Sequence, residues 1–279
     1  MSTLRAYRLT RGTIGCGLIG LIAILGAAGW RASFDHDARP AKNDAPVTRV
    51  FSEAVSATVL VRVSNSDGVC REGSGVLVGG GHYVLTNAHV ATGSSSGPPY
   101  ILNPPPDPAC TRVSIGVLEA TQLNPAQWLT AEVVQSRPTV DLALLQITDP
   151  KAPELPAAII DESEMKLGDN IYLIGFPDYG SDSVVLTDGM VAGRYEADYG
   201  YFVMATAAIS GGNSGGPAIS AEGTVVGIST LGAPVQIICT EEENNDNWCS
   251  LKRSQIALVR PVMFAQPLLN LIGKATKSP

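Results

Sequence analysis

Histidine is scarce in this sequence: the 279 residues contain only His36, His82 and His89. Any chemistry that needs an imidazole base must therefore use one of these three side chains. The sequence also has no Cys-Xaa-Xaa-Cys pair, the usual signature of a structural zinc site. We expect no metal and no cofactor. Aromatic residues make up only 6% of the chain, so the core should consist mainly of Val, Ile, Leu and Ala.

Basic residues are also in short supply. Lys and Arg number 19 against 26 Asp and Glu, and the formal net charge is −7. Three of the basic residues, Arg5, Arg8 and Arg11, lie in the first thirty positions, which contain no acidic residue. The remaining chain is therefore even more acidic. Because phosphate backbones are bound by clustered Lys and Arg, we expect no nucleic-acid partner.

An uncharged, apolar run of 18 residues occupies positions 13–30. At about 1.5 Å per residue, a helix of this length reaches roughly 27 Å, enough to cross the hydrocarbon core of a membrane. The preceding arginines would keep residues 1–12 in the cytoplasm. We expect residues 13–30 to be a transmembrane anchor or, because small residues occur at 26–29, a cleaved signal peptide. The protein would then be exported: membrane-anchored with its body outside the cytoplasm (periplasmic or extracellular), or secreted.

Five cysteines are present. Cys16 lies within the apolar run, whereas Cys70, Cys110, Cys239 and Cys249 fall in the part expected to be exported, where disulfides form. Four cysteines allow three pairings. A local Cys239–Cys249 bridge would close the acidic stretch between them and leave Cys70 to pair with Cys110, but the pairing stays open at this point.

Four glycines fall within residues 211–217, Gly-Gly-Asn-Ser-Gly-Gly-Pro. Glycine is costly in a helix or strand interior, and it is used where φ must be positive or where the backbone approaches another group closely. Ser214 lies in the middle, with backbone N–H groups on both sides. A nucleophilic serine beside an oxyanion hole requires these features. A glycine-rich turn between strands is the alternative.

A serine nucleophile needs a base, and a histidine base needs a carboxylate to orient it. His89 follows an apolar run in the motif Thr-Asn-Ala-His-Val. Asp141 opens the strand-like run Asp-Leu-Ala-Leu-Leu-Gln-Ile. His36 lies in a polar, unpatterned segment and His82 at the expected tip of a hairpin, so we expect neither to be catalytic.

The three segments occur in the order His89, Asp141, Ser214, and they resemble the motifs of trypsin-like serine proteases, closest to the bacterial HtrA/Deg branch. The resemblance extends over residues 54–261. The segment Gly-Asn-Ser-Gly-Gly also fits the Gly-Xaa-Ser-Xaa-Gly pattern of α/β-hydrolases. In those enzymes the histidine follows the serine, and no histidine follows Ser214 here, so that fold is excluded.

The resemblance implies a role for each motif residue. His89 would be the general base, Asp141 would orient it, Ser214 would attack the substrate, and the N–H groups of Gly212 and Ser214 would form the oxyanion hole. Two further segments would bind the substrate: Ala208, Ile209, Ser210, Ile228, Ser229 and Thr230. Position 208, at the base of the pocket for the residue before the cut bond, holds alanine and no carboxylate. We therefore expect cleavage after small or medium apolar residues.

Short apolar strand patterns separated by turns indicate an all-β fold. About a dozen such strands divide six and six, which predicts two packed antiparallel six-stranded β-barrels of the chymotrypsin/trypsin-like type. The expected domains are a tether at 31–53, a first barrel at 54–150, a connection at 151–162, a second barrel at 163–260 and a C-terminal helix at 261–279. We expect no PDZ domain of the kind that many HtrA relatives carry.

The sequence thus predicts a serine endopeptidase that acts on protein or peptide substrates through an acyl-enzyme. A second interpretation remains open, in which the chain is a protease-like binding or scaffold module whose oxyanion hole does not form. The oligomeric state is not determined by the sequence.

Overall fold

A computed structural model of the chain describes residues 46–93, 108–119, 122–178, 182–197, 199–232, 237–240, 248–251 and 256–275. The predicted cytoplasmic N-terminus at 1–12, the predicted membrane or signal segment at 13–30 and most of the predicted tether lie outside these residues. In the part that is described, no helix has the length and apolar character needed to span a bilayer.

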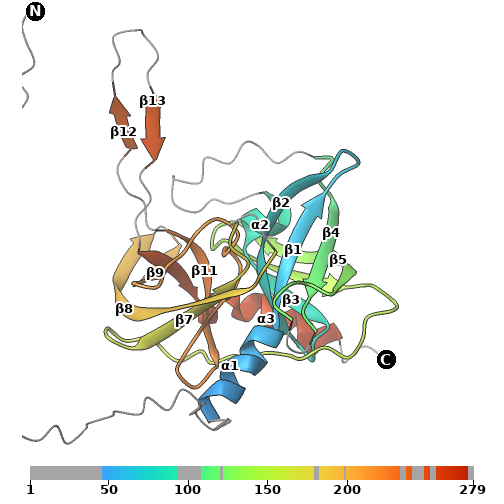
Figure 1. Cartoon of the computed structure of the whole chain (residues 1–279), viewed down its shortest axis with the longest axis horizontal. Coiled ribbons are helices and arrows are strands. Elements are labelled where there is room, and N and C mark those ends of the chain that lie inside the picture. Colours follow the sequence, from blue (N-terminus) through green and yellow to red (C-terminus); the bar gives the residue numbers. More distant parts are fainter. Residues whose placement is uncertain are drawn as a thin grey trace, which may run out of the picture. The chain divides into compact units, whose positions relative to one another are not determined.

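Six antiparallel strands close the first barrel in the order β1-β2-β3-β6-β5-β4 (Figure 1, blue to green). The strands alternate inward apolar and outward polar side chains or are apolar on both faces, as the sequence patterns predicted. Three consecutive glycines with φ between 60° and 82° form the β2–β3 turn, a conformation that other residues rarely adopt. The strands are β1 (Thr58–Ser64), β2 (Val69–Val78), β3 (Tyr83–Thr86), β4 (Arg112–Val117), β5 (Gln127–Arg137) and β6 (Leu142–Ile147).

The second barrel closes in the order β10-β11-β14-β9-β8-β7, which repeats the connectivity of the first. Its strands are coloured yellow to red in Figure 1. The two six-stranded barrels predicted from the sequence are thus confirmed. The strands are β7 (Asn170–Gly175), β8 (Val185–Ala197), β9 (Gly200–Ala205), β10 (Pro217–Ile219), β11 (Val225–Gly232) and β14 (Ala257–Pro261).

A separate two-stranded ribbon, β12 (Ile237–Thr240) and β13 (Trp248–Leu251), follows β11 in the sequence. It was not predicted, because the acidic stretch between Cys239 and Cys249 masked the short apolar patterns beside it. These two cysteines are direct partners in the β12–β13 register, the position in which cross-strand neighbours come closest. Their side chains lie outside the description, so the Cys239–Cys249 bridge stays a prediction.

Helices flank the barrels in sequence. The 3₁₀ helix η1 (Val262–Ala265) and helix α3 (Gln266–Ala275) provide the predicted C-terminal helix. Helix α1 (Pro46–Ser56) differs from the expectation of a tether up to residue 53. Proline is pre-organised for the first helical position, so Pro46 starts this helix. The ring of Phe51 packs edge-on against Tyr172 of β7, with centroids 4.6 Å apart.

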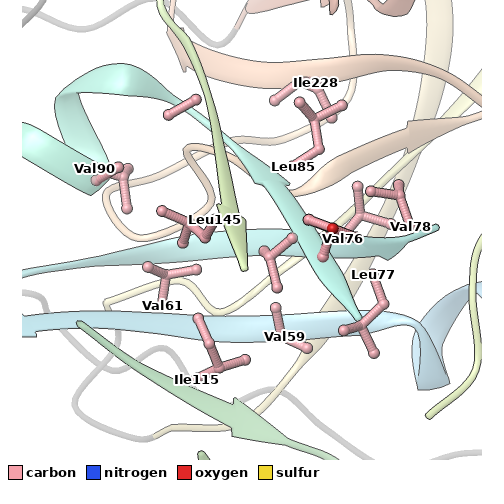
Figure 2. Close-up of a cluster of buried hydrophobic side chains, with 14 of the residues drawn as sticks. Val59, Val61, Val76, Leu77, Val78, Leu85, Val90, Ile115, Leu145 and Ile228 are labelled. Atoms are coloured by element: carbon pink, nitrogen blue, oxygen red, sulfur yellow. The ribbon is translucent and has the colours of Figure 1, made fainter. Parts of the chain in front are cut away.

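One hydrophobic cluster joins the two barrels. It contains Leu85 and Leu145 from the first barrel together with Ile174 and Ile228 from the second, all of them buried. Figure 2 shows Ile228 beside Leu85 within this cluster. A smaller cluster fills the second barrel. The shared cluster holds together the strands that bear the candidate functional residues.

Cys70, near the start of β2, and Cys110, just before β4, form a disulfide across 40 residues of sequence. In the chain-entropy account, such a cross-link stabilises the fold by restricting the unfolded state, typically by about 2–4 kcal/mol. The bridge encloses residues 71–109, the part of the chain that contains His89.

Truncation of the shared cluster should destabilise the protein. Leu145 is fully buried, so Leu145→Ala should lower the free energy of unfolding by about 2–5 kcal/mol through lost contacts and a residual cavity. Val134 on the neighbouring strand is 42% exposed, and Val134→Ala should cost less than about 1 kcal/mol. Denaturant titration of both variants measures the difference, and equal losses would show that the cluster is not central to stability.

Candidate active site

His89 lies on the one-and-a-half-turn helix α2 (Ala88–Thr92) that follows β3. Asn87 has the extended backbone of an N-cap, and Gly93 ends the helix in the left-handed conformation with its N–H donating to the His89 carbonyl at 3.0 Å. The His89 side chain is 14% exposed. The short helix therefore places the His89 imidazole in a partly accessible position, directly after the buried strand β3.

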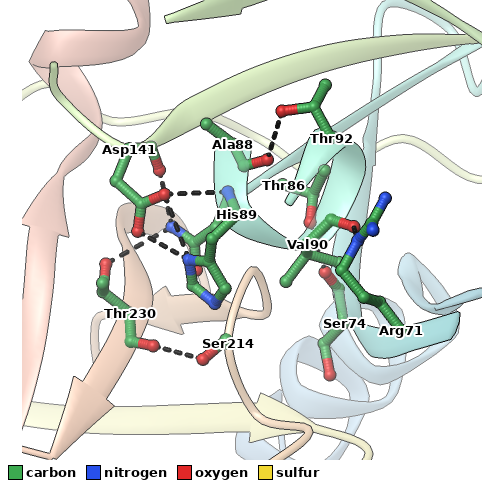
Figure 3. Close-up of polar contacts among 11 residues, drawn as sticks. Arg71, Ser74, Thr86, Ala88, His89, Val90, Thr92, Asp141, Ser214 and Thr230 are labelled. Atoms are coloured by element: carbon green, nitrogen blue, oxygen red, sulfur yellow. Dashed lines mark hydrogen bonds and ion pairs between the residues drawn. The ribbon is translucent and has the colours of Figure 1, made fainter. Parts of the chain in front are cut away.

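Asp141 forms hydrogen bonds with both the backbone and the ring of His89. Its carboxylate is fully buried and accepts the His89 backbone N–H at 3.0 Å and the ring Nδ1–H at 2.8 Å to Oδ2 and 3.1 Å to Oδ1 (Figure 3). Asp141 has φ of +55°, the only positive value for a non-glycine residue in the described part of the chain. Such strain is tolerated best by Asp and Asn and often occurs at functional sites. Two bonds to Nδ1 leave Nε2 as the free ring nitrogen.

Ser214 lies in the loop before β10 and is 5% exposed. Gly212 and Gly215 on either side have φ of +87° and +89°. A Cβ at Gly212 would lie 2.2 Å from the Phe176 carbonyl oxygen, and one at Gly215 would lie 2.1 Å from the Ser74 carbonyl oxygen. Gly212 and Gly215 thus meet both requirements inferred from the sequence, positive φ and close approach.

A hydrogen-bond chain connects Ser214 to Asp141. The Ser214 hydroxyl donates to the Thr230 carbonyl, and the Thr230 hydroxyl accepts from Asn87 Nδ2 at 3.3 Å. Asn87 Nδ2 also donates to the Asp141 carbonyl at 2.8 Å. Within the described residues, no hydrogen bond joins Ser214 Oγ to the His89 ring, toward which it lies in Figure 3. The serine hydroxyl is therefore directed at the Thr230 carbonyl and is not bonded to the imidazole.

Three successive peptide groups before Ser214 are held by hydrogen bonds to their carbonyls. Gly211 O accepts from Asp178 N at 2.7 Å, and Gly212 O accepts from Ser74 Oγ at 2.7 Å. Asn213 O accepts from Ser229 Oγ at 2.7 Å. Because a trans peptide directs its N–H opposite to its C=O, these bonds set the directions of the following N–H groups.

The N–H groups of Gly212 and Ser214 donate to no other group of the described residues. The carbonyls of the same two peptide groups, Gly211 O and Asn213 O, accept hydrogen bonds from Asp178 and Ser229. Neither carbonyl therefore blocks the N–H groups. Two unengaged N–H groups flanking one hydroxyl are the arrangement that stabilises an oxyanion.

Ser74 was not identified from the sequence. It lies on β2 of the first barrel, is fully buried, and makes four hydrogen bonds. Its hydroxyl donates to Gly212 O and accepts Phe176 N–H at 2.8 Å, its N–H donates to Ser214 O at 2.7 Å, and its carbonyl accepts the Thr86 hydroxyl at 2.6 Å. The only signal in the sequence is a polar residue between two glycines, directly before the apolar run at 76–78.

Asn87 was also missed, although it lies inside the quoted Thr-Asn-Ala-His-Val motif. It is fully buried, and its Oδ1 has no hydrogen-bond partner among the described residues. A buried amide whose oxygen has no hydrogen-bond partner lowers the stability of the fold. The amide in question is the one that joins Asp141 to Thr230.

The residues expected to bind substrate are placed unequally. Ala208 is exposed, while Ile209 and Ser210 are half-buried, so this segment borders solvent next to the Ser214 loop. Ile228 and Ser229 are fully buried. Ile228 packs in the shared core, and the Ser229 hydroxyl donates to Asn213 O and Gly216 O, so only the backbone of this segment is left for the substrate contact, which stays a prediction.

Arg260 on β14 is a buried cation near the site. It is 1% exposed, its Nη1 donates to the Tyr201 carbonyl at 2.9 Å, and its guanidinium stacks 3.5 Å from the centre of the Phe202 ring. Burial lowers the pKa of Arg260 to about 10, and the Asp141 carboxylate opposes this shift. Arg260 is therefore cationic at neutral pH, and its charge interacts favourably with Asp141.

The remaining sequence candidates lie elsewhere. His82 is exposed in the β2–β3 turn, and His36 lies outside the described residues. No cluster of three or more potential metal ligands occurs in the described ranges.

Comparisons with known proteins identify the family of this chain. The model of the trypsin-like peptidase domain family matches residues 73–228. A probable periplasmic serine endoprotease, DegP-like, from Brucella suis is 31% identical over 163 residues, which cover 57% of this chain and 27% of that protein. The serine protease Do-like HtrA of Bacillus subtilis is 31% identical over 181 residues, covering 60% of this chain and 35% of that protein. The chain thus matches about a quarter to a third of the length of these relatives.

Solved structures share the fold. The serine endoprotease from Yersinia pestis superposes with a TM-score of 0.57 and 22% identity, covering 81% of this chain and 66% of that one. The HtrA-type protease AlgW, solved with a tripeptide, gives a TM-score of 0.59 and 21% identity, covering 81% and 63%. The resemblance to trypsin-like proteins of the HtrA branch, first seen in three motifs, is confirmed.

Removal of the Ser74 hydroxyl should disturb the Ser214 loop without unfolding the protein. Ser74→Ala leaves Gly212 O and Phe176 N–H without their partner, so the Gly212 peptide loses its restraint. We expect the rate of Ser214 labelling by a fluorophosphonate to fall roughly ten- to a hundredfold, less than the loss of an oxyanion donor itself. Ser66→Ala, in the exposed β1–β2 loop, is the matched control. An unchanged rate in Ser74→Ala would mean that the loop does not depend on this hydroxyl.

Proposed function

The chain belongs to the trypsin-like peptidase domain family, and from this we propose that it is a serine endopeptidase of the HtrA branch, acting on protein or peptide substrates. The observation that supports the proposal most strongly is the pair of bonds from the buried Asp141 carboxylate to His89 Nδ1. A structural histidine needs no such partner, whereas a general base needs its tautomer fixed.

The proposed reaction begins with rotation of the Ser214 hydroxyl from the Thr230 carbonyl toward His89 Nε2. His89 removes the proton as Ser214 Oγ attacks the substrate carbonyl carbon, and Asp141 stabilises the imidazolium that forms. The N–H groups of Gly212 and Ser214 bind the oxyanion. His89 then protonates the leaving amine as the peptide bond breaks. A water molecule, activated by the same base, hydrolyses the acyl-enzyme and regenerates Ser214.

Substrate preference should follow the segment at 208–210. Ala208 is exposed and small, Ile209 is half-buried, and neither brings a carboxylate to the pocket for the residue before the cut bond. A small or medium apolar side chain, such as Ala, Val or Leu, would lose little by desolvation there, whereas a Lys or Arg would lack a counter-ion. The backbone of Thr230 would align the same residue.

We propose an extracytoplasmic location. The relative from Brucella suis is named as periplasmic, and the Cys70–Cys110 disulfide suits an oxidising compartment. The apolar run at 13–30 would either anchor the protein in the membrane or be removed as a signal peptide.

A protease-like scaffold remains the second candidate, and one observation favours it: the Ser214 hydroxyl is bonded to Thr230 and not to His89. Against it, the Gly211 carbonyl is engaged by Asp178 and does not block the Gly212 N–H. Catalytic hydrogen bonds are also often unformed before substrate binds. We therefore favour the active enzyme.

The activated serine can be tested by labelling the purified full chain with a fluorophosphonate probe. Labelling should occur in the wild type and be absent in Ser214→Ala. It should fall by roughly a thousandfold or more in His89→Ala and Asp141→Asn, because the base is removed or held in the wrong tautomer. His82→Ala is the matched control and should label normally. A folded wild type that does not label would favour the scaffold.

Specificity can be tested with a peptide library varied at the residue before the cut bond. Cleavage should concentrate after Ala, Val and Leu, with the value of kcat/KM for Arg lower by at least about tenfold, since an unpaired buried cation costs more than 1.4 kcal/mol. Preferred cleavage after Arg would contradict the assignment of Ala208 to the base of this pocket.

A further inference from the structure

A cavity of about 490 Å³ opens on the first-barrel side of the Ser214 loop. Gly212, whose N–H is proposed to bind the oxyanion, forms one part of its lining. The first residues of β2 and the segment that follows β7 form most of the rest. The mechanism proposed above uses none of these residues except Gly212.

The position of the cavity identifies the part of a substrate that would reach it. The residues proposed for the acyl side, at 208–210 and Thr230, do not line it. Of the residues proposed to contact the substrate, only Gly212 also lines the cavity. Its N–H is proposed to bind the oxygen of the carbonyl that Ser214 attacks. A substrate peptide whose residues before the scissile bond lie on the acyl side would therefore direct its residues after the bond toward the cavity.

The inner surface of the cavity is partly apolar, with Leu60, Val69, Phe176 and Pro177 in its lining. A long side chain could place its methylene groups against these residues and keep a polar end in water, as Lys and Arg commonly do. The shape therefore suits an extended side chain more than a short one.

Negative charges outnumber positive ones among the described residues that line the cavity. Three carboxylates line it, those of Glu72, Asp178 and Asp182. Arg62 forms ion pairs with Glu72 and, at 3.4 Å, with Asp182. Asp178 is exposed, and no cation of the described residues pairs with its carboxylate. Its backbone is held by the bond from its N–H to Gly211 O.

Arg71 is the one cation among the described residues that line the cavity. Its Nε donates to the carbonyl of Val90 on α2 at 3.4 Å, as Figure 3 shows. The guanidinium is thus directed at the helix that bears His89, and the cavity keeps a net negative charge beside Asp178.

We propose that this cavity binds a basic side chain of the substrate, within two residues after the scissile bond, and that the Asp178 carboxylate selects it. The proposal rests on the proposed endopeptidase function. The enzyme would then recognise an apolar residue before the cut and Lys or Arg after it, two chemistries on opposite sides of Gly212.

The test uses quenched-fluorescent peptides with one acyl side and with Arg, Leu or Glu at the first or second position after the cut. In the wild type, kcat/KM for Arg should exceed that for Leu by roughly two- to fivefold at one position, the range of an exposed ion pair. Asp178→Asn should bring the ratio to about one, and Asp178→Lys should favour Glu. Ratios within each variant cancel any general change in activity. Glu162→Gln, an exposed carboxylate outside the cavity, should keep the wild-type ratio.

Salt dependence gives a second measurement that needs no variant. The Arg-over-Leu ratio should shrink between about 0.05 and 0.5 M salt, because screening weakens an exposed ion pair. Equal rates for Arg and Leu at both positions, or a preference that survives in Asp178→Asn, would overturn the proposal.

The design separates this proposal from the function on which it rests. A wild type that neither labels with a fluorophosphonate nor cleaves any peptide overturns both. A wild type that labels and cleaves, but does not distinguish the residues after the cut, overturns the cavity proposal and leaves the endopeptidase standing.

Discussion

The site depends on one contact between the barrels, the hydrogen bonds of Ser74 to the Ser214 loop. His89 and Asp141 belong to the first barrel, whereas Ser214 lies in the loop directly before β10 of the second barrel. Residues on separate barrels can act together only if the two barrels are held in a fixed position relative to each other. Ser74 provides this restraint with two bonds of 2.7 Å, from its N–H to Ser214 O and from its hydroxyl to Gly212 O. The shared apolar cluster below it keeps water away from these bonds, which strengthens them.

Unfavourable features are concentrated around the same residues. Asp141 has a positive φ, Asn87 has an unpaired buried oxygen, and Arg260 has a buried Nε without a partner in the described chain. Each costs free energy that a structural protein could avoid by substitution. The surrounding core, which is built mainly from aliphatic side chains, offsets these costs. Such strain is expected where geometry serves chemistry and not stability.

Much of the fold was predictable because period-two patterns and glycine turns act locally. Strands such as β6 were found from their apolar runs, and the six-and-six division followed. Helix α1 was missed because the prolines and charges of residues 32–49 suggested a tether, whereas the helix is stabilised by packing such as that of Phe51 against Tyr172. The β12–β13 ribbon was missed because its strands are four residues each, too short to show a period.

The sequence by itself determined the types and order of the three motif residues, because a nucleophile, a base and a carboxylate are limited to few side chains, and only one suitable histidine exists. It also determined where glycine was needed, but not which atoms approach each glycine closely. Only the tertiary structure decided that Ser74 and Asn87 support the site, that Ile228 and Ser229 face inward, and that Asp178 borders a cavity. These facts depend on contacts between residues as far apart as 138 positions, which no local pattern encodes.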